Sequence, residues 1–409
     1  MVAILGMGVV SPAGTGVRAL WNGLCSGRSF ARRLPVEVAG LPLIGHVVPD
    51  GEWAACVSTS EARRLDRFTL LGMAAATEAV SAARSLWDGV APARRAVVTG
   101  VGFGGITTLT HQHDVLRERG WRRLSPFGVV AVMSTSLAGL ASMKLDARGP
   151  VSTVSSACAS GTHALIDGAR LIVDGSADIV LAGGAEAPLD ALPMSSFARM
   201  EAMNWRAADP AAASRPFDVD RTGFVLGEGA AFMVLASDDL AHTSGLPVLG
   251  TIDGWALTSD AHHPTAPQPN GDGSERAMRQ ALAMAAVRPA EVAHVNAHGT
   301  GTKLNDAAEA RALTTVFGSS VPVTSVKGTL GHLMGAAGAV EAVACLVAAR
   351  DGVVPPTVNC DELDGDMEID VVMGGVRSVP IGPAVSCSFG FGGQNAAIVM
   401  SPAQGRGAS

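Results

Sequence analysis

The sequence predicts an α/β protein built from two similar halves. Short apolar runs alternate with longer Ala-rich runs at helical spacing, which is the pattern of buried, largely parallel strands joined by helices. Two segments also resemble each other: GEGAAFMVLAS at 227–237 and GGQNAAIVMS at 392–401 share a glycine-led turn, an Ala-Ala pair and a closing apolar run. This similarity indicates a duplicated half. The polar stretch AHTSGLP at 241–247 predicts the boundary, giving halves of 1–240 and 241–409.

Eight apolar runs are expected to form the strands, in chain order. They are residues 2–8, 95–102, 177–185, 230–237, 248–257, 293–299, 321–328 and 384–393. A helix is expected within 159–175, because its apolar residues recur at helical spacing and Gly175 can end it in a left-handed cap.

Composition bounds the class of protein. At 409 residues the chain exceeds one ordinary domain of about 150 residues. Hydrophobic residues make up 48%, but Gly, Asp or Arg interrupts every apolar run before about 18 residues, so no membrane span is expected. The start MVAILGMGVVSPAG has neither a basic leader nor an A-x-A site, which predicts a cytoplasmic protein. A net charge of −7 argues against nucleic acid as a partner.

Six scattered cysteines without a C-x-x-C pair predict free thiols, with neither a zinc site nor a disulfide framework. No third ligand stands at useful spacing from the histidine pairs at 111/113 and 262/263, so no metal site is expected. The string TGVGFGG at 99–105 lacks G-x-G-x-x-G spacing, which argues against a dinucleotide cofactor.

Cys158 is the first candidate for chemistry. It lies in VSTVSSACASG, among small residues and at the start of the helix expected from 159. Backbone N–H groups at a helix N-terminus favour a thiolate, so a lowered pKa of Cys158 is expected, and the same groups can hold an oxyanion. The alternative is a small buried cysteine with a packing role.

Two histidines occupy similar strand-to-helix turns. His298 lies in AHVNAHGTGTKLNDAAEA, just past an expected strand and before a helix that begins near Asn305. His332 lies in VPVTSVKGTLGHLMGAAGAVEA, in the turn that follows another strand. Ligands bind at such turns in α/β folds, so both are candidates beside Cys158. A structural role is the alternative for each.

Lys327 and Glu341 flank His332 in the chain. Lys327 is one of only three lysines, so composition does not explain its presence in this motif. A Lys-Glu pair behind a histidine can fix its orientation and protonation. An ordinary ion pair is the alternative.

The last candidate motif is SCSFGFGGQNAAIVM, in which Phe389 and Phe391 stand between glycines. Because glycine permits close backbone approach, this loop can bring an N–H to an oxyanion and present an aromatic gate. A glycine-rich hairpin is the alternative.

The strings SSACASG, NAHGTGT, VKGTLGHLMGAAGAVEA and SFGFGGQN resemble the active-site blocks of the β-ketoacyl-acyl carrier protein synthases. These are the elongating condensing enzymes of fatty acid and polyketide synthesis. The resemblance runs from GMGVVSPAG near the start, through RPFDVDRTGFVLGEGAA, to the last expected strand. It implies a thiolase-like fold with duplicated α-β-α-β-α layered halves, a dimer, and no cofactor.

The resemblance also implies roles for the candidates. Cys158 would take an acyl chain from a carrier-protein thioester, and His298 and His332 would promote decarboxylation of a malonyl thioester for a Claisen condensation. The N–H groups of Cys158 and Phe391 would form the oxyanion hole. Lys327 and Glu341 would organise the His332 side. The family's substrate pocket or gate matches Phe103, Gly128, Phe197, Thr300, Thr302, Phe389 and Phe391.

The implied partners are acyl- and malonyl-loaded acyl carrier protein and a second subunit. Arginines near the family's docking segments are candidates for the carrier protein, with solvated helix faces as the alternative. They are Arg63, Arg64, Arg67, Arg122 and Arg123. The second subunit is either another copy of this chain or a chain-length-factor-like homologue.

Three features differ from the family pattern. Gln394 stands where Thr is usual, Gly128 where a bulkier residue often reaches toward the partner's pocket, and Phe103 where a smaller aliphatic is common. They leave acyl chain length and partner open. His332 stands where chain-initiating relatives carry Asn, which favours elongation. The alternatives are a non-elongating acyltransferase or thiolase-like enzyme, and a structural chain-length-setting subunit.

Overall fold

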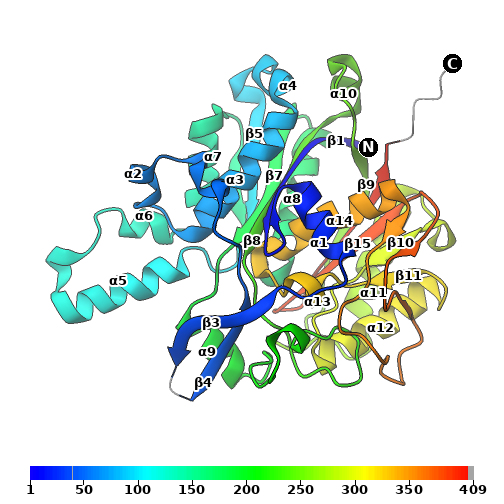
Figure 1. Cartoon of the computed structure of the whole chain (residues 1–409). Helices are drawn as coiled ribbons and strands as arrows, with labels where there is room; N and C mark the ends of the chain where they lie inside the picture. Colours follow the sequence, from blue (N-terminus) through cyan, green and yellow to red (C-terminus); the bar gives the residue numbers. More distant parts are fainter. Residues whose placement is uncertain (39, 404–409) are drawn as a thin grey trace.

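The computed structural model of this chain describes residues 1–38 and 40–403 (Figure 1). The strands are β1 (Val2–Ser11), β2 (Gly14–Thr15), β3 (Ala31–Val38), β4 (Leu41–His46), β5 (Arg95–Gly100), β6 (Val151–Val154), β7 (Ile179–Glu186), β8 (Gly229–Ser237), β9 (Gly250–Ser259), β10 (His294–Asn296), β11 (Pro322–Thr324), β12 (Val353–Val354), β13 (Asp370–Val371), β14 (Arg377–Ser378), β15 (Ala384–Gly390) and β16 (Gln394–Pro402).

The helices are α1 (Val17–Cys25), α2 (Thr59–Ala62), α3 (Arg67–Ala82), α4 (Arg84–Gly89), α5 (Ile106–Arg119), α6 (Gly128–Val132), α7 (Ser136–Leu145), α8 (Ser160–Val173), α9 (Ala191–Arg199), α10 (Asp238–Ser244), α11 (Asp272–Ala285), α12 (Lys303–Phe317), α13 (Lys327–Leu330) and α14 (Ala337–Asp351). Two short 3-10 turns lie at the candidate site, η4 (Ala157–Ala159) and η7 (Met334–Ala336).

The two halves repeat one sheet topology. In the first half the order is β6-β5-β7-β8-β1, with β6, β5 and β7 parallel and β8 and β1 antiparallel to their neighbours. In the second half the order β11-β10-β15-β16-β9 has the same pattern of parallel and antiparallel pairs. The two segments that resemble each other in sequence are β8 and β16, which occupy equivalent positions. The predicted duplicated α/β fold is therefore confirmed.

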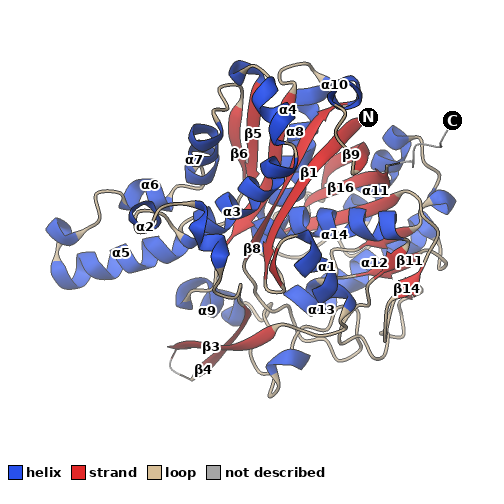
Figure 2. Cartoon of the chain, turned by 45° about the horizontal axis from the view of Figure 1, so that its top comes forward, coloured by secondary structure: helices blue, strands red, loops and turns tan. Residues whose placement is uncertain are grey.

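Five layers follow from how the helices pack. Helices α3 and α7 cover the outer face of the first sheet, and α11 and α12 cover the outer face of the second. Helices α8 and α14 pack between the sheets, and an apolar cluster with residues from both sheets surrounds them. Figure 2 shows the strands of both halves crossing the centre of the molecule around α14. The turns that carry Cys158 and His332 lead into α8 and α14, so this central layer positions two of the three candidate residues, and the turn that carries His298 leads into α12.

The two half-sheets are joined edge to edge. Val2, Ala3 and Ile4 of β1 pair antiparallel with Ile252, Thr251 and Gly250 of β9. Each of the eight predicted strand regions contains a strand. The β3–β4 hairpin, β6 and the short strands β2, β12, β13 and β14 were not predicted, and β16 was expected only as the closing run of the segment 392–401. Helix α5 projects from the body of the molecule (Figure 1). Within the described residues no helix combines the length and apolar character needed to cross a bilayer.

Candidate active site

Cys158 lies in a tight turn between β6 and α8. Ala157 before it has a left-handed backbone with φ of 51°, an unusual conformation for a residue with a side chain. Gly390 at the end of β15 lies so close that an added Cβ would stand 2.8 Å from Ser156 O and 3.2 Å from Cys158 N. This contact between the halves explains the small residues on both sides, and it leaves Cys158 only 5% exposed.

His332 is directly hydrogen-bonded to the cysteine. Its Nε2 lies 3.0 Å from Cys158 Sγ, and its Nδ1 accepts the Met334 N–H at 3.2 Å. Because Nδ1 accepts, the proton of the neutral ring is on Nε2 and points at the sulfur. Met334 has φ of 49°, so a second left-handed residue sets this geometry.

His298 follows β10 on the opposite side of the same space. Glu309 of α12 accepts the N–H groups of His298 and Gly299, both at 2.7 Å, and so fixes the turn. The rings of His298 and His332 are 5.4 Å apart, centroid to centroid, and nearly perpendicular. His298 is 1% exposed, as is His332.

The Lys327–Glu341 pair lies on the His298 side, which corrects the expectation that it would organise His332. Lys327 Nζ lies 3.3 Å from His298 Nδ1, donates to His298 O, and pairs with Glu341. The reason is that α13, which begins with Lys327, runs beside the turn after β10. The ammonium donates to Nδ1, so the proton of neutral His298 is also on Nε2.

Burial governs the acid-base behaviour of these groups. It raises the pKa of Cys158 to about 11, against the opposing effects of the Lys327 charge and the Phe391 N–H, so the predicted lowering was wrong. Burial and the Lys327 charge together hold the pKa of His298 and of His332 well below the usual value. At neutral pH the site therefore holds a protonated thiol and two neutral N–H donors.

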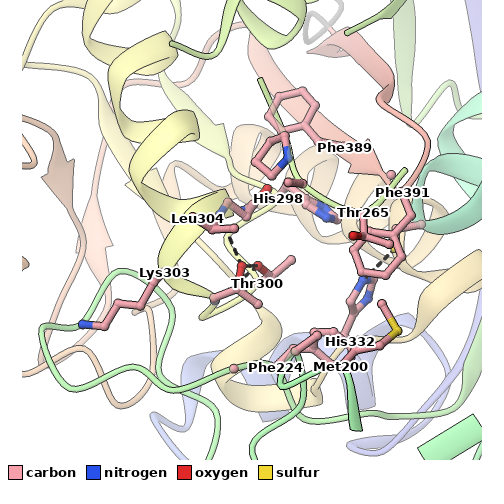
Figure 3. Close-up of a pocket in the computed structure, with 18 of the residues that line it drawn as sticks. Met200, Phe224, Thr265, His298, Thr300, Lys303, Leu304, His332, Phe389 and Phe391 are labelled. Atoms are coloured by element: carbon pink, nitrogen blue, oxygen red, sulfur yellow. Dashed lines mark hydrogen bonds between the residues drawn. The ribbon is translucent and has the colours of Figure 1, made fainter. Parts of the chain in front are cut away.

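These groups open into a cavity of about 410 Å³ (Figure 3). Five of the predicted pocket residues line it: Phe197, Thr300, Thr302, Phe389 and Phe391. The close-up shows His298 and Phe389 on one side and His332, Phe391 and Met200 on another. Phe391 also directs its N–H toward Cys158 Sγ. A carbonyl carbon bonded to the sulfur would lie beside this N–H, which is the geometry of an oxyanion site.

Phe103 does not line this cavity but is linked to it by ring contacts. Its ring lies 6.0 Å from Phe197, which lies 5.3 Å from Phe224, which lies 5.4 Å from the ring of His332. Sequence reasoning missed Phe224. The available signal was its place directly after Gly223 in RPFDVDRTGFVLGEG, since Phe391 follows Gly390 in the same way.

Gly128 and several docking candidates lie elsewhere. Gly128 lines a second cavity of about 370 Å³ together with Arg63, Arg64 and Arg67. Arg67 is not free to bind a partner as expected, because its guanidinium forms a two-point ion pair with the buried Glu228, at 2.5 and 2.8 Å. The other candidates are exposed residues, and Arg122 and Arg123 lie just after α5.

Cys158, His298 and His332 offer three ligand atoms within 4.8 Å of one another, but the surrounding groups do not suit a metal ion. A metal-bound imidazole normally donates its second ring N–H to an acceptor. Here the Nδ1 atoms face donors, the Met334 N–H and the Lys327 ammonium. The nitrogens that face the cavity therefore carry protons and have no free lone pair for a metal.

Known proteins resemble this chain over 98% of its length. Residues 1–241 match the β-ketoacyl synthase N-terminal domain and residues 249–361 the β-ketoacyl synthase C-terminal domain. The chain is 35% identical over 408 residues to the 3-oxoacyl-[acyl-carrier-protein] synthase 2 of Synechocystis sp., covering 98% of both. It is 38% identical over 416 residues to the protein of that name from Rhizobium meliloti, again covering 98% of both.

Solved structures give the same result. The ishigamide ketosynthase/chain length factor matches with a TM-score of 0.89 and 33% identity, and a β-ketoacyl synthase from Burkholderia phymatum with 0.90 and 30%. Each match covers 98% of this chain and 99% of the other. A type II polyketide ketosynthase, AntDE, in complex with its acyl-carrier protein AntF matches with 0.86 and 30%, over 98% of this chain and 99% of that one.

Proposed function

Because this chain belongs to the β-ketoacyl synthase family, and is thus an acyltransferase of fatty acid or type II polyketide synthesis, we propose that it elongates acyl chains on Cys158 by decarboxylative condensation. The observation that carries the proposal is the 3.0 Å contact between Cys158 Sγ and His332 Nε2, with a second N–H donor on His298 across the same cavity. The thiol can accept the acyl chain, and the two neutral N–H donors can stabilise the enolate that decarboxylation forms.

The first step loads the enzyme. Cys158 attacks the acyl thioester of a carrier protein, so that a C–S bond to Cys158 forms and the C–S bond to the carrier breaks. The departing carrier sulfur takes the proton of the Cys158 thiol. The N–H groups of Phe391 and Cys158 stabilise the oxyanion that forms between these events.

The second step generates the carbon nucleophile. A malonyl thioester loses CO₂, and the electrons of the broken C–C bond form an enolate on the thioester. The Nε2–H groups of His298 and His332 donate to the enolate oxygen. Because loss of CO₂ supplies the carbanion, no strong base is required, and neutral imidazoles suffice.

The third step forms the product. The enolate carbon attacks the acyl carbonyl on Cys158, the new C–C bond forms, and the C–S bond to Cys158 breaks. The β-ketoacyl chain, longer by two carbons, leaves on the carrier protein. The Cys158 thiolate takes a proton from solvent, which restores the thiol for the next acyl group.

Decarboxylation of malonyl-loaded carrier protein tests the proposal. Wild type should release CO₂, whereas His298→Ala and His332→Ala should do so at least about 100-fold more slowly, because each removes one enolate donor. Mass mapping after iodoacetamide or cerulenin should find Cys158 among the modified thiols, beside the half-buried Cys25 and Cys56. The buried Cys345 serves as the internal control for labelling.

The same experiment separates the competing functions. A thiolase-like acyltransferase would label at Cys158 but would not decarboxylate the malonyl group. A structural chain-length-setting subunit would do neither. Either result in folded wild type would contradict an elongating enzyme.

For the carrier protein we propose a docking surface that includes Arg122 and Arg123, which are exposed after α5. Arg122→Glu/Arg123→Glu should raise the KM for acyl-carrier protein but not for a small acyl thioester, because only the protein substrate contacts this surface. Arg18→Glu, an exposed arginine on α1, is the matched control. An equal change in KM for both substrates would contradict docking here.

A second subunit is the other proposed partner. Strand β6 pairs only with β5 among the described strands, and helix α6 exposes large apolar side chains that include Val129 at 76% and Val130 at 56%. Such a surface fits a protein interface. The ishigamide relative pairs a ketosynthase with a chain length factor. Sedimentation of the chain alone distinguishes a homodimer from a subunit that requires such a homologue.

A further inference from the structure

Glu186, the last residue of β7, is a buried carboxylate without an assigned role. It is fully buried, and its oxygens accept four backbone N–H groups. Gly102, Phe103 and Gly104 donate at 2.7, 3.0 and 3.2 Å, and Gly335 donates at 3.0 Å. A carboxylate that receives several amide donors is held strongly in one position.

The four donors come from two loops that are far apart in the chain. Three belong to the loop after β5, which carries Phe103, and the fourth belongs to η7, directly after His332. The loops touch each other at Glu186, since an added Cβ on Gly335 would lie 2.4 Å from Gly102 N and 2.6 Å from Glu186 Oε2. Glycine is therefore required at position 335. The close approach of the two loops explains the glycines in both the TGVGFGG and the HLMGAAG motif.

Met334 connects this carboxylate to the reactive histidine. Its own N–H donates to His332 Nδ1, and the next N–H in the chain, that of Gly335, donates to Glu186. Between these two bonds Met334 has a left-handed φ of 49°, which is an unfavourable conformation for a residue with a side chain. The strained backbone persists because both flanking amides are held.

We propose that Glu186 is a positioning residue that joins the Phe103 loop to the His332 turn and, through Met334, keeps the His332 proton on Nε2. Without the Glu186 acceptor, Met334 relaxes toward an ordinary backbone conformation and its N–H leaves His332 Nδ1. The proton then distributes between the two ring nitrogens, and the donor to the enolate is lost in part. The ring contacts from Phe103 through Phe197 and Phe224 to His332 loosen at the same time.

This inference rests on the proposed function and deepens it. The proposed reaction requires an N–H donor on His332 Nε2, and the inference states what holds that donor in place. The test uses Glu186→Gln, which keeps the size of the side chain but replaces one acceptor oxygen by a donor. Imidazole ¹⁵N NMR of histidine-labelled protein reports which ring nitrogen carries the proton. The signals of His332 and His298 are assigned by their loss in His332→Asn and His298→Asn.

In wild type, both histidines should show the proton on Nε2. In Glu186→Gln the His332 signals should shift toward a mixture of tautomers, whereas His298, held by Lys327, should keep its own. Malonyl decarboxylation should fall by roughly tenfold or more. Glu78→Gln is the matched control, since Glu78 also accepts a backbone N–H, that of Val9 at 2.9 Å, away from both loops.

Retention of the Nε2–H signal of His332 in folded Glu186→Gln overturns the inference, whatever the activity, and so does a mixed tautomer with full decarboxylation. If Glu186→Gln does not fold, Glu186→Asp is measured in the same way, because its shorter side chain cannot contact both loops. The NMR readout needs no turnover. Wild type without decarboxylation would therefore reject the proposed function while the link from Glu186 to His332 is still measured.

Discussion

At the scale of residues, each of the three candidate residues Cys158, His298 and His332 lies within two residues of a left-handed backbone position. Ala157 precedes Cys158, Gly299 follows His298, and Met334 lies two residues after His332, with φ of 51°, 37° and 49°. Two of the three carry side chains, and such conformations persist only where the surroundings hold them. Here the surroundings are the close approach of Gly390 and the carboxylates of Glu309 and Glu186, so the reactive atoms are fixed before substrate binds.

Burial of Cys158 predicts an alkaline reactivity profile. Its alkylation rate by iodoacetamide should rise about tenfold per pH unit above pH 7 and level off only near pH 11, because burial raises the pKa of the thiol to about 11. Mass-resolved rates at Cys158, with circular dichroism to monitor folding, measure this. A plateau by pH 8 would show instead that the resting group is a thiolate.

The buried Lys327–Glu341 pair predicts a non-additive mutant cycle. Lys327→Met should lower the free energy of unfolding by about 3–5 kcal/mol, because it leaves a buried carboxylate without its cation. Lys327→Met/Glu341→Gln should recover much of that loss, yet remain slow in decarboxylation since His298 Nδ1 has lost its donor. Urea unfolding and CO₂ release provide the two measurements. Additive losses of stability would contradict direct pairing.

Sequence reasoning singled out Cys158, His298 and His332, which lie together in the structure, because strand-turn-helix motifs carry a recognisable local pattern. It could not find that Lys327 contacts His298, since this depends on how α13 packs against a turn 29 residues earlier. It also gave the wrong direction for the pKa of Cys158. The helix terminus is visible in the sequence, but the extent of burial depends on both halves.

At the scale of elements, α8 and α14 pack with almost no space between their first turns. A Cβ on Gly338 would lie 2.0 Å from Thr162 Oγ1 and 2.8 Å from Thr162 N, and a Cβ on Gly161 would lie 2.7 Å from Ala339 N. These helices follow the Cys158 and His332 turns. Their close contact therefore determines the distance between sulfur and imidazole.

Gly338→Ala should separate these helices. We expect it to lower the free energy of unfolding by about 1–3 kcal/mol through overpacking and to slow the condensation. Gly139→Ala on α7 is the matched control, because an added Cβ there meets nothing within 4 Å and alanine favours the helix. Urea unfolding of both variants measures the difference. Equal stability of Gly338→Ala and wild type would contradict the close packing.

The elements that were predicted and those that were missed differ in burial. Strands β1, β5, β7 and β8 were predicted because every residue but the last of β8 is buried, so each reads as an apolar run. Strand β6 was missed because its residues, VSTV, are half-buried or exposed. Strand β3 was missed as well, because its sequence ARRLPVEV contains charged residues and a proline, which are not typical of a buried strand.

At the scale of the whole molecule, the duplicated architecture encloses several imidazoles. His46, His294, His298 and His332 are all buried. Burial lowers the pKa of each, to about 3 for His46 and about 4 for His294. Below pH 6.5 the unfolded chain binds protons that the folded chain does not. The stability that these neutral imidazoles contribute is therefore fully present above pH 6.5, and it is lost as the pH falls toward their folded-state pKa values.

His294 makes this loss measurable. With a pKa of about 4 folded and 6.5 unfolded, it should remove about 2 kcal/mol of stability between pH 8 and pH 5. His294→Gln should reduce the pH-dependent loss by that amount. Urea unfolding of wild type and variant at the two pH values measures the difference. The same loss in His294→Gln as in wild type would exclude His294 as a source.

The duplicated whole was predictable from the β8 and β16 segments, which have similar sequences and equivalent places in the sheets. The cavity was not, because its lining comes from both halves. Met200 and Phe224 precede residue 241, whereas Thr300 and Phe389 follow it. Because these lining residues come from separate segments in both halves, they share no local sequence pattern that would predict a cavity.

The pairing of β1 has a consequence for how the protein is made. Val2 at the start of β1 pairs with Ser237 of β8, near the end of the first half, and with Ile252 of β9, near the start of the second half, so β1 leaves the ribosome long before either partner. At about 5–20 residues per second this delay is about 10–50 s. During that time a ten-residue strand that is wholly buried in the finished protein is exposed. Nascent chains stalled before β8 should therefore bind chaperones, and longer ones should be released.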